Sequence, residues 1–245
     1  DISVFTNRAL KPLVFESKNE KMKPSFKISV SDKNDCPRYI GAVVRNITIG
    51  PSPDWMQERL IAVGQRPINN LVDISNYILM EMGQPTHIFD WDKIDSKEIL
   101  VRRANKKESI KTLDNGSFKL DQDQLLITDG KKPIAIAGVM GGFDSSVNDE
   151  TKTVFLESAY FDPVTIRKSS KSLSLSTEAS KRYERGADPE AAINAFWKIL
   201  ELIKKYADGS FDGEFLDLYS HSTRHNSILV RLSEVNQIIG LQLDK

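Results

Sequence analysis

The sequence predicts an α+β protein in which mixed and antiparallel β-sheets are packed with helices. From residue 95 to about 160 the apolar residues mostly recur with period two between turn signals, which is typical of β-strands. Over 69–82 and 188–207, on either side of this region, they recur every three or four positions, which predicts amphipathic helices. Strands grouped between helices therefore indicate the α+β class.

Composition excludes several other classes of protein. With 245 residues, 40% apolar and 28% charged, the chain has the composition of a globular protein with one large domain or two small ones. Its 34 basic and 34 acidic residues cancel, so any contact with nucleic acid must come from local basic patches. The single cysteine, Cys36, excludes an internal disulfide framework and a multi-cysteine zinc site, and it fits a reducing cytosol. The apolar runs are too short to cross a membrane.

The first 50 residues are expected to contain a domain boundary. Residues 1–11 are interpreted as the tail of a helix, and the alternating segment 26–30 as an edge strand or linker. Polar and charged residues dominate 16–35, which places the boundary near Cys36. Residues 38–49 are rich in β-branched and aromatic side chains and predict a buried strand. Because the chain starts at Asp1 rather than Met, we interpret it as a piece of a longer protein.

Two helices are predicted next. Ser52, Pro53 and Asp54 open the first helix, and Gly64 ends it. The second, over 69–82, carries more polar side chains than an ordinary core helix. Its apolar stripe at helical spacing consists of Leu71, Ile74, Ile78 and Met82, and its polar face of Asn69, Asp73 and Asn76.

The segment after the second helix brings a histidine close to that polar face. Gly83 suits a left-handed helix end, and Pro85 prevents the helix from resuming, so His87 follows on a short, stiff segment. We interpret the helix and His87 as half of a pocket, with a purely structural histidine as the alternative.

Two predicted strands carry the remaining candidates. The strand that starts at Pro133 is built of small residues and ends in Gly141 and Gly142, which let another group approach the backbone closely. A close-packed turn, a pocket wall whose amides face a ligand, and a phosphate loop are the alternatives for this turn. Glu157 interrupts an apolar strand at 153–159, so it is either outward and solvated or inward and matched by a partner.

The C-terminal part is predicted to be mostly helical. Two short helices at 163–171 and 177–185 carry a concentration of basic residues, which form a solvated face or contact a phosphate backbone. These residues are Arg167, Lys168, Lys171, Lys181, Arg182 and Arg185. Residues 209–227 are interpreted as a polar connection, in which His221 and His225 are surface residues, and 230–243 as the first helix of a further domain.

Five ordered motifs closely resemble the editing region of the bacterial phenylalanine–tRNA ligase beta subunit. They are spread over about 120 residues, and the resemblance covers roughly 37–212. The motifs are Arg66-Pro67-Ile68-Asn69-Asn70, Val72-Asp73-Ile74-Ser75-Asn76-Tyr77, Gly83-Gln84-Pro85-Thr86-His87-Ile88-Phe89-Asp90, Ala137-Gly138-Val139-Met140-Gly141-Gly142 and Arg182-Tyr183-Glu184-Arg185-Gly186.

The resemblance implies a function and a domain organisation. Residues 37–212 would be an editing domain that hydrolyses tyrosine wrongly attached to the phenylalanine tRNA, with 1–36 as a remnant of the preceding domain and linker. Residues 213–245 would be a linker and the start of the following domain. The whole cytoplasmic enzyme would be a heterotetramer with an alpha subunit that uses ATP and magnesium. This chain alone is expected to need no cofactor and to attach no amino acid to tRNA.

The resemblance also assigns site residues. Candidates for catalysis are His87, Asn76 and Ser75; candidates for substrate binding are Glu157, Gly141, Thr177, Ala179 and Arg66; no metal ligand is expected. The family commonly has threonine where this chain has Ser75, which retains the hydroxyl but loses a methyl group. We expect the pocket to lie between the 69–82 helix and the sheet. A non-catalytic tRNA-binding or subunit-packing module is the alternative function.

Overall fold

In the computed structural model, which describes residues 2–10, 24–220 and 227–243, the expected buried strand is β2 (Arg38–Val44), and all seven of its residues are buried. It lies within a four-stranded antiparallel sheet in the order β11-β2-β10-β3. The other strands of this sheet are β3 (Thr86–Asp90), β10 (Val154–Tyr160) and β11 (Phe215–Tyr219).

A second sheet of five strands has the order β1-β4-β7-β8-β9. Its first pair is parallel and the others are antiparallel, so the sheet is mixed, as expected. Its strands are β1 (Lys27–Val30), β4 (Glu98–Arg103), β7 (Leu125–Thr128), β8 (Pro133–Ile136) and β9 (Met140–Gly141). The expected hairpin around Asn115 joins β5 (Ser109–Lys111) to β6 (Ser117–Lys119).

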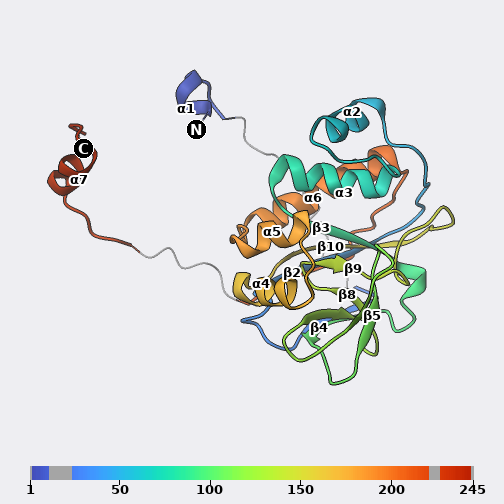
Figure 1. Cartoon of the computed structure of the whole chain (residues 1–245). Helices are drawn as coiled ribbons and strands as arrows, with labels where there is room; N and C mark the ends of the chain where they lie inside the picture. Colours follow the sequence, from blue (N-terminus) through green and yellow to red (C-terminus); the bar gives the residue numbers. More distant parts are fainter. Residues whose placement is uncertain (1, 11–23, 221–226, 244–245) are drawn as a thin grey trace.

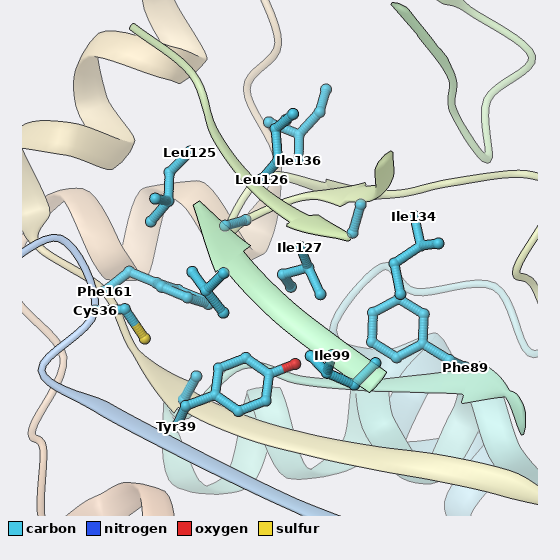
Figure 2. Close-up of a cluster of buried hydrophobic side chains, with 14 of the residues drawn as sticks. Cys36, Tyr39, Phe89, Ile99, Leu125, Leu126, Ile127, Ile134, Ile136 and Phe161 are labelled. Atoms are coloured by element: carbon cyan, nitrogen blue, oxygen red, sulfur yellow. The ribbon is translucent and has the colours of Figure 1, made fainter. Parts of the chain in front are cut away.

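The four-stranded sheet is buried on both faces because a different layer covers each face. Odd-numbered residues of β2 such as Tyr39 and Val43 pack against the five-stranded sheet, in the core drawn in Figure 2. Even-numbered residues such as Ile40 and Ala42 pack against three helices. These helices are α2 (Asp54–Ala62), α3 (Asn70–Met82) and α6 (Ala191–Tyr206), seen together at the top of Figure 1. This layering confirms the α+β class.

Shorter helices complete the described structure. The turn η1 (Trp91–Lys93) follows β3, and α4 (Pro163–Ser172) and α5 (Glu178–Glu184) follow β10. Two further helices, α1 (Ile2–Thr6) and α7 (Leu232–Ile239), lie apart from the main body and bury none of their residues (Figure 1). The helices expected near both ends of the chain are therefore present.

Helix α3 forms as its sequence predicts. The Asn69 side chain caps its first turn by accepting from the Val72 amide at 3.0 Å, and Gly83 ends it in the left-handed conformation with φ of 71°. Leu71, Ile74 and Ile78 are wholly buried against the four-stranded sheet.

Asp73 has a structural role that the sequence did not indicate. Its carboxylate accepts hydrogen bonds from the Ser52 hydroxyl and, at 2.8 Å, from the Ile68 amide. The side chain is 1% exposed. Asp73 therefore ties two loops to the start of α3 and does not offer a free polar group to a pocket.

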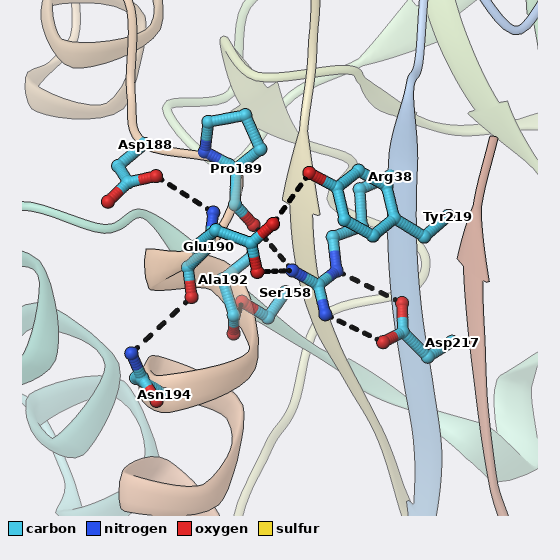
Figure 3. A network of polar contacts seen from close by, with 9 residues as sticks. All are labelled: Arg38, Ser158, Asp188, Pro189, Glu190, Ala192, Asn194, Asp217 and Tyr219. Carbon is cyan, nitrogen blue, oxygen red and sulfur yellow. Dashed lines mark hydrogen bonds and ion pairs between the residues drawn. The ribbon is translucent and has the colours of Figure 1, made fainter. Parts of the chain in front are cut away.

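The polar connection expected from residue 209 contains a strand instead. Residues 215–219 form β11 on the edge of the four-stranded sheet, where Asp217 accepts from the Arg38 guanidinium at 2.8 and 3.1 Å. Arg38 also donates to Glu190, just before α6, and stacks on the Tyr219 ring (Figure 3). The prediction of a polar connection was wrong for residues 215–219 because the pairing partner of β11 lies far away in sequence.

The structure describes the two ends of the chain only in part. Residues 11–23 of the expected remnant and linker at 1–36 lie outside the described residues, as do His221 and His225, which are expected on the surface. Strands β1 and β11 extend the two sheets beyond 37–212 at both ends. The edge strand expected at 26–30 is confirmed as β1.

Replacing Asp73 by alanine is expected to destabilise the fold. The Ser52 hydroxyl and the Ile68 amide would lose their acceptor, so the free energy of unfolding should fall by about 2 kcal/mol. Urea unfolding measures this change, with Glu58→Ala on the exposed face of α2 as the control. Equal unfolding midpoints for the two variants would contradict the structural role of Asp73.

Candidate functional site

Glu157 lies in the middle of β10 and faces inward, so the structure selects one of the two alternatives. The residue is 4% exposed. It stands directly opposite Gly41 of β2 and His87 of β3 in the antiparallel ladders. Directly opposite residues project from the same face of a sheet, so Glu157 and His87 share the face that is covered by the five-stranded sheet.

The Glu157 carboxyl has a neutral partner rather than a cation. Burial raises its pKa from 4.5 to about 8, and a hydrogen bond from the Tyr39 hydroxyl acts in the opposite direction. The Tyr39 oxygen lies 3.1 Å from Glu157 Oε2. Among the described residues no Lys, Arg or His forms an ion pair with Glu157. The carboxyl is therefore mostly protonated at neutral pH, and its charge is sensitive to any ligand that enters.

His87 is positioned on β3 as a neutral imidazole. Desolvation lowers its pKa from 6.5 to about 4, although part of the side chain reaches the surface. Its ring packs edge-on against Phe89, with 4.5 Å between the ring centroids. A neutral imidazole has one nitrogen that donates and one that accepts, so it can orient a water molecule or a hydroxyl group.

Gly141 meets His87 across the two sheets. A Cβ atom at position 141 would lie 2.5 Å from His87 Cε1 and 2.6 Å from Nε2, so only glycine leaves room for the ring. A Cβ atom at Gly142 would lie 2.5 Å from the Ile134 carbonyl oxygen. The paired glycines therefore permit the close approach that the sequence indicated.

The direction of the Gly141 amide follows from the strand pairing. The Gly142 amide donates to the Ile134 oxygen at 2.8 Å, which makes this a hydrogen-bonded pair of the β8–β9 ladder. Hydrogen-bonded and non-bonded pairs alternate along an antiparallel ladder, so the Gly141 amide points away from β8. The Gly141 carbonyl accepts from the Leu113 amide at 3.1 Å on that side.

Helix α5 is tied to the loop that precedes Gly141. The Thr177 hydroxyl donates to the Val139 carbonyl at 2.8 Å and accepts from the Ser180 amide at 3.1 Å, which caps the helix. Ala179 lies in the first turn of α5 and is partly buried. Thr177 is thus placed near the site through its contact with the turn, while its hydroxyl is already engaged.

The three remaining candidates belong to α3 and the loop before it. The Ser75 hydroxyl donates to the Thr86 carbonyl at 2.8 Å, which links α3 to the residue before His87. Asn76 is partly buried on the same helix. Arg66 is exposed, and within the described residues it makes no ion pair.

The expected position of the pocket needs correction. Glu157, His87 and Gly141 come together between the two sheets, whereas α3 packs on the opposite face of the four-stranded sheet. Side chains alternate along a strand, so Thr86 faces α3 and its neighbour His87 faces away from it. The site therefore lies between the sheets, and α3 approaches it only at the edge that β3 forms.

Sequence reasoning missed three polar residues, one that contacts Glu157 and two that bind the carbonyl of Ala159, two residues further along β10. Tyr39 is wholly buried and donates to Glu157, but an aromatic residue in an apolar strand signals only a core position. The Gln84 amide nitrogen donates to the Ala159 carbonyl at 2.8 Å, and Tyr183 donates to the same oxygen at 3.0 Å. The Gln84 Oε1 atom is buried without a hydrogen-bond partner in the described part of the chain.

Basic side chains of α4 and α5 are partly neutralised. Glu178 pairs with Lys181 at 2.9 Å and with Arg182 at 2.7 Å. The other four basic residues singled out from the sequence are exposed, and none forms an ion pair with another described residue: Arg167, Lys168, Lys171 and Arg185.

Two classes of site are not found within the described residues. No group of three or more His, Cys, Asp or Glu side chains is arranged to hold a metal ion. None of the described helices combines the length and the apolar character needed to cross a membrane.

Sequence comparisons relate the chain to known proteins. The B3/4 domain family matches residues 35–208. Three curated relatives are each described as a phenylalanine–tRNA ligase beta subunit: those of Carboxydothermus hydrogenoformans (45% identical over 217 residues), Protochlamydia amoebophila (41% over 247) and Bacillus cereus (46% over 224). The alignments cover 89%, 100% and 91% of this chain but only 27%, 31% and 28% of the relatives, so the chain spans less than a third of their length.

A solved structure shares the fold. It is an N-terminal fragment of the phenylalanyl-tRNA synthetase beta-subunit from Pyrococcus horikoshii, which superimposes with a TM-score of 0.51 over 95% of this chain and 65% of that chain. At 14% identity, the likeness concerns the fold alone.

The stability of the chain should depend on pH through Glu157. The folded-state pKa of about 8 exceeds the unfolded value of 4.5, so the folded state binds more protons between these values. This contribution to stability is present below pH 4.5 and is lost as the pH rises through 8. Relative to Glu157→Gln, the wild-type chain should lose up to about 1.4 kcal/mol of unfolding free energy per pH unit in that window. Urea unfolding between pH 5 and pH 8 measures the difference, and parallel curves would rule it out.

Replacing Gly141 by alanine should displace the His87 ring. The added methyl group overlaps the ring edge, so the imidazole must move toward solvent, and its pKa should rise from about 4 toward 6.5. NMR titration of the imidazole protons measures both values. Gly50→Ala, where an added Cβ atom meets no other atom within 4 Å, is the control and should leave the His87 titration unchanged. An unaltered His87 pKa in Gly141→Ala would contradict the close contact.

Proposed function

The chain belongs to the B3/4 domain family and corresponds to that region of phenylalanine–tRNA ligase beta subunits, and we propose that it hydrolyses tyrosine wrongly attached to the phenylalanine tRNA. The observation that carries this proposal is the buried Glu157 carboxyl, which lies without a cationic partner beside His87, and the His87 ring in turn contacts Gly141. Such a group suits the recognition of one extra hydroxyl on an otherwise apolar ring.

Discrimination between tyrosine and phenylalanine requires a polar group that forms a hydrogen bond with the tyrosine hydroxyl. A hydrophobic pocket rejects an added hydroxyl only weakly, whereas a site that hydrogen-bonds the hydroxyl discriminates strongly against the analogue that lacks it. We assign the accepting role to Glu157 Oε1 and a donating role to the Gly141 amide. Phenylalanine would leave both groups desolvated and without partners, and this penalty is the basis of selectivity.

The hydrolytic step needs no covalent nucleophile from the protein. The ester that joins an amino acid to a ribose hydroxyl is already activated, so the protein has to hold the ester and one water molecule in position. Water attacks the ester carbonyl, the bond to the ribose oxygen breaks, and that oxygen takes a proton, which releases tyrosine and the intact tRNA. The neutral His87 ring is the candidate for orienting the water.

The other assigned residues would hold the rest of the substrate. We propose that Ser75 and Asn76 act at the edge formed by β3 on the water or the terminal adenosine, and that Arg66 anchors the end of the tRNA. Ser75 donates to the Thr86 carbonyl, so its contribution would come through the position of β3. Thr177 and Ala179 would shape the wall beside the tyrosine ring.

Binding of tRNA is proposed to depend on the whole enzyme. The exposed basic residues of α4 and α5 supply local contacts to phosphates, but the zero net charge of the chain provides no general attraction. The relatives are beta subunits, which supports an alpha subunit as partner. We propose that the two kinds of subunit form a heterotetramer. We place the assembled ligase in the cytoplasm and assign its ATP and magnesium to amino acid attachment, outside this region.

A deacylation assay tests the proposal. The phenylalanine tRNA, charged either with tyrosine or with phenylalanine, is incubated with the assembled two-subunit ligase and, separately, with this chain. The ligase should release tyrosine and spare phenylalanine. Glu157→Ala should lower kcat/KM for the tyrosyl ester roughly 10- to 100-fold, because the buried tyrosine hydroxyl would be left without its acceptor. Hydrolysis of the phenylalanyl ester should rise, because the carboxyl that phenylalanine leaves without a partner is gone.

Controls separate this function from a non-catalytic module. Glu150→Ala removes an exposed carboxylate of the same type and should behave like the wild type. Binding of tRNA without hydrolysis by the wild-type ligase would favour a tRNA-binding or subunit-packing module. If Glu157→Ala hydrolyses each ester at the same rate as the wild type, Glu157 does not recognise the tyrosine hydroxyl.

A further inference from the structure

We propose that Tyr39 is a positioning residue of this site: its hydroxyl holds one oxygen of the Glu157 carboxyl so that the other oxygen is presented to the substrate. The inference rests on the proposed function, in which Glu157 reads the tyrosine hydroxyl. Tyr39 itself touches no reacting atom and acts through Glu157.

The geometry of the two strands places Tyr39 for this role. Tyr39 pairs with Ala159 across the β2–β10 ladder, two residues from Glu157, and so projects from the same face of the sheet. Directly opposite Glu157 stands Gly41, which has no side chain to compete for the carboxyl. The Tyr39 ring is wholly buried beside Phe161, with 6.5 Å between ring centroids, so its hydroxyl has a fixed position (Figure 2).

The hydrogen bond from Tyr39 gives the two oxygens of the Glu157 carboxyl different roles. Tyr39 donates to Oε2 at 3.1 Å, and no other described residue donates a hydrogen bond to this carboxyl. Oε1 has no such partner in the same part of the chain. A glutamate side chain has three rotatable bonds, and one anchored oxygen restricts the orientation of the other. Tyr39 thereby keeps Oε1 available for a hydroxyl that arrives with the substrate.

The same bond affects the charge of Glu157. Four titratable groups face the carboxyl or lie near it: Tyr39 of β2, Cys36 just before β2, His87 of β3 and Tyr183 of α5. Burial raises the pKa of Cys36, Tyr39 and Tyr183, so all three stay neutral, as does His87 above pH 5. Because it donates to Glu157, Tyr39 is the neighbour that favours the ionised carboxylate, which accepts a hydrogen bond more strongly than the neutral acid.

Tyr39→Phe removes the hydroxyl and retains the buried ring. In the assembled ligase it should lower kcat/KM for tyrosyl-tRNA hydrolysis about 10-fold, because the buried Glu157 carboxyl loses its hydrogen-bond donor. The limb of the pH profile that reflects ionisation of Glu157 should move to higher pH. In a Glu157→Gln background the same change should have little further effect, because Tyr39 acts only through the carboxylate.

Tyr183→Phe is the matched control. Tyr183 is also buried, but its hydroxyl donates to the backbone carbonyls of Ala159 and Pro85 rather than to Glu157. This variant should leave the pH limb in place, whatever its effect on stability. Tyr39 would be only a packing residue if Tyr39→Phe lowered activity equally in the wild-type and Glu157→Gln backgrounds. The same conclusion would follow if Tyr39→Phe left the limb of the pH profile at the same pH.

A titration of the carboxyl separates this inference from the proposed function. Carbon-13 NMR of labelled glutamate side chains in this chain, with Glu157→Gln to assign the signal, gives the pKa of Glu157 directly. Tyr39→Phe should raise that pKa and Tyr183→Phe should not. If the wild-type ligase fails to hydrolyse tyrosyl-tRNA, the proposed function fails, while this titration still decides the contact. An unchanged Glu157 pKa in Tyr39→Phe would overturn the inference.

Discussion

The site depends on a carboxyl group that is buried without a cation. Desolvation of Glu157 destabilises its charged form, and the resulting pKa of about 8 means that the folded chain holds the group mostly as the neutral acid. A fold tolerates this arrangement when the surrounding packing fixes the group and at least one hydrogen bond satisfies it. Here both sheets supply the packing, and the Tyr39 hydroxyl supplies the bond. The uncompensated second oxygen is then a place where a substrate hydroxyl gains more than it would in water.

The layers of the fold explain why these groups meet. The four-stranded sheet packs one face against the helices and the other against the five-stranded sheet. Successive residues along its strands therefore point alternately into two different cores. Glu157 and His87 project into the core between the sheets, and the glycine at the end of β9 leaves the space that the histidine ring needs. Helix α5 is fastened to the same turn through Thr177. The candidate site is thus built from β3, β9 and β10, segments far apart in sequence.

Local signals predicted much of this structure, and long-range pairing accounts for what they missed. Helix α3 carries its own start and stop residues, Asn69 and Gly83, so its bounds could be predicted almost to the residue. The sequence left the direction of Glu157 open because six of the seven residues of β10 are buried, and a strand buried on both faces shows no alternation. Strand β11 could not be predicted from local signals because its partner β2 lies some 180 residues earlier by number. The pocket was placed on the wrong side of the sheet for the same reason, since the register of β3 against β10 decides which face His87 occupies.

If the tyrosine hydroxyl is recognised between the two sheets, a structure with a bound substrate analogue will show it there. The analogue is 3′-tyrosylamido-3′-deoxyadenosine, in which an amide replaces the labile ester. We expect the phenolic oxygen to lie within hydrogen-bonding distance of Glu157 Oε1 and of the Gly141 amide, with His87 beside the amide carbonyl. A phenol bound between α3 and the sheet, or one directed to solvent away from Glu157, would contradict it.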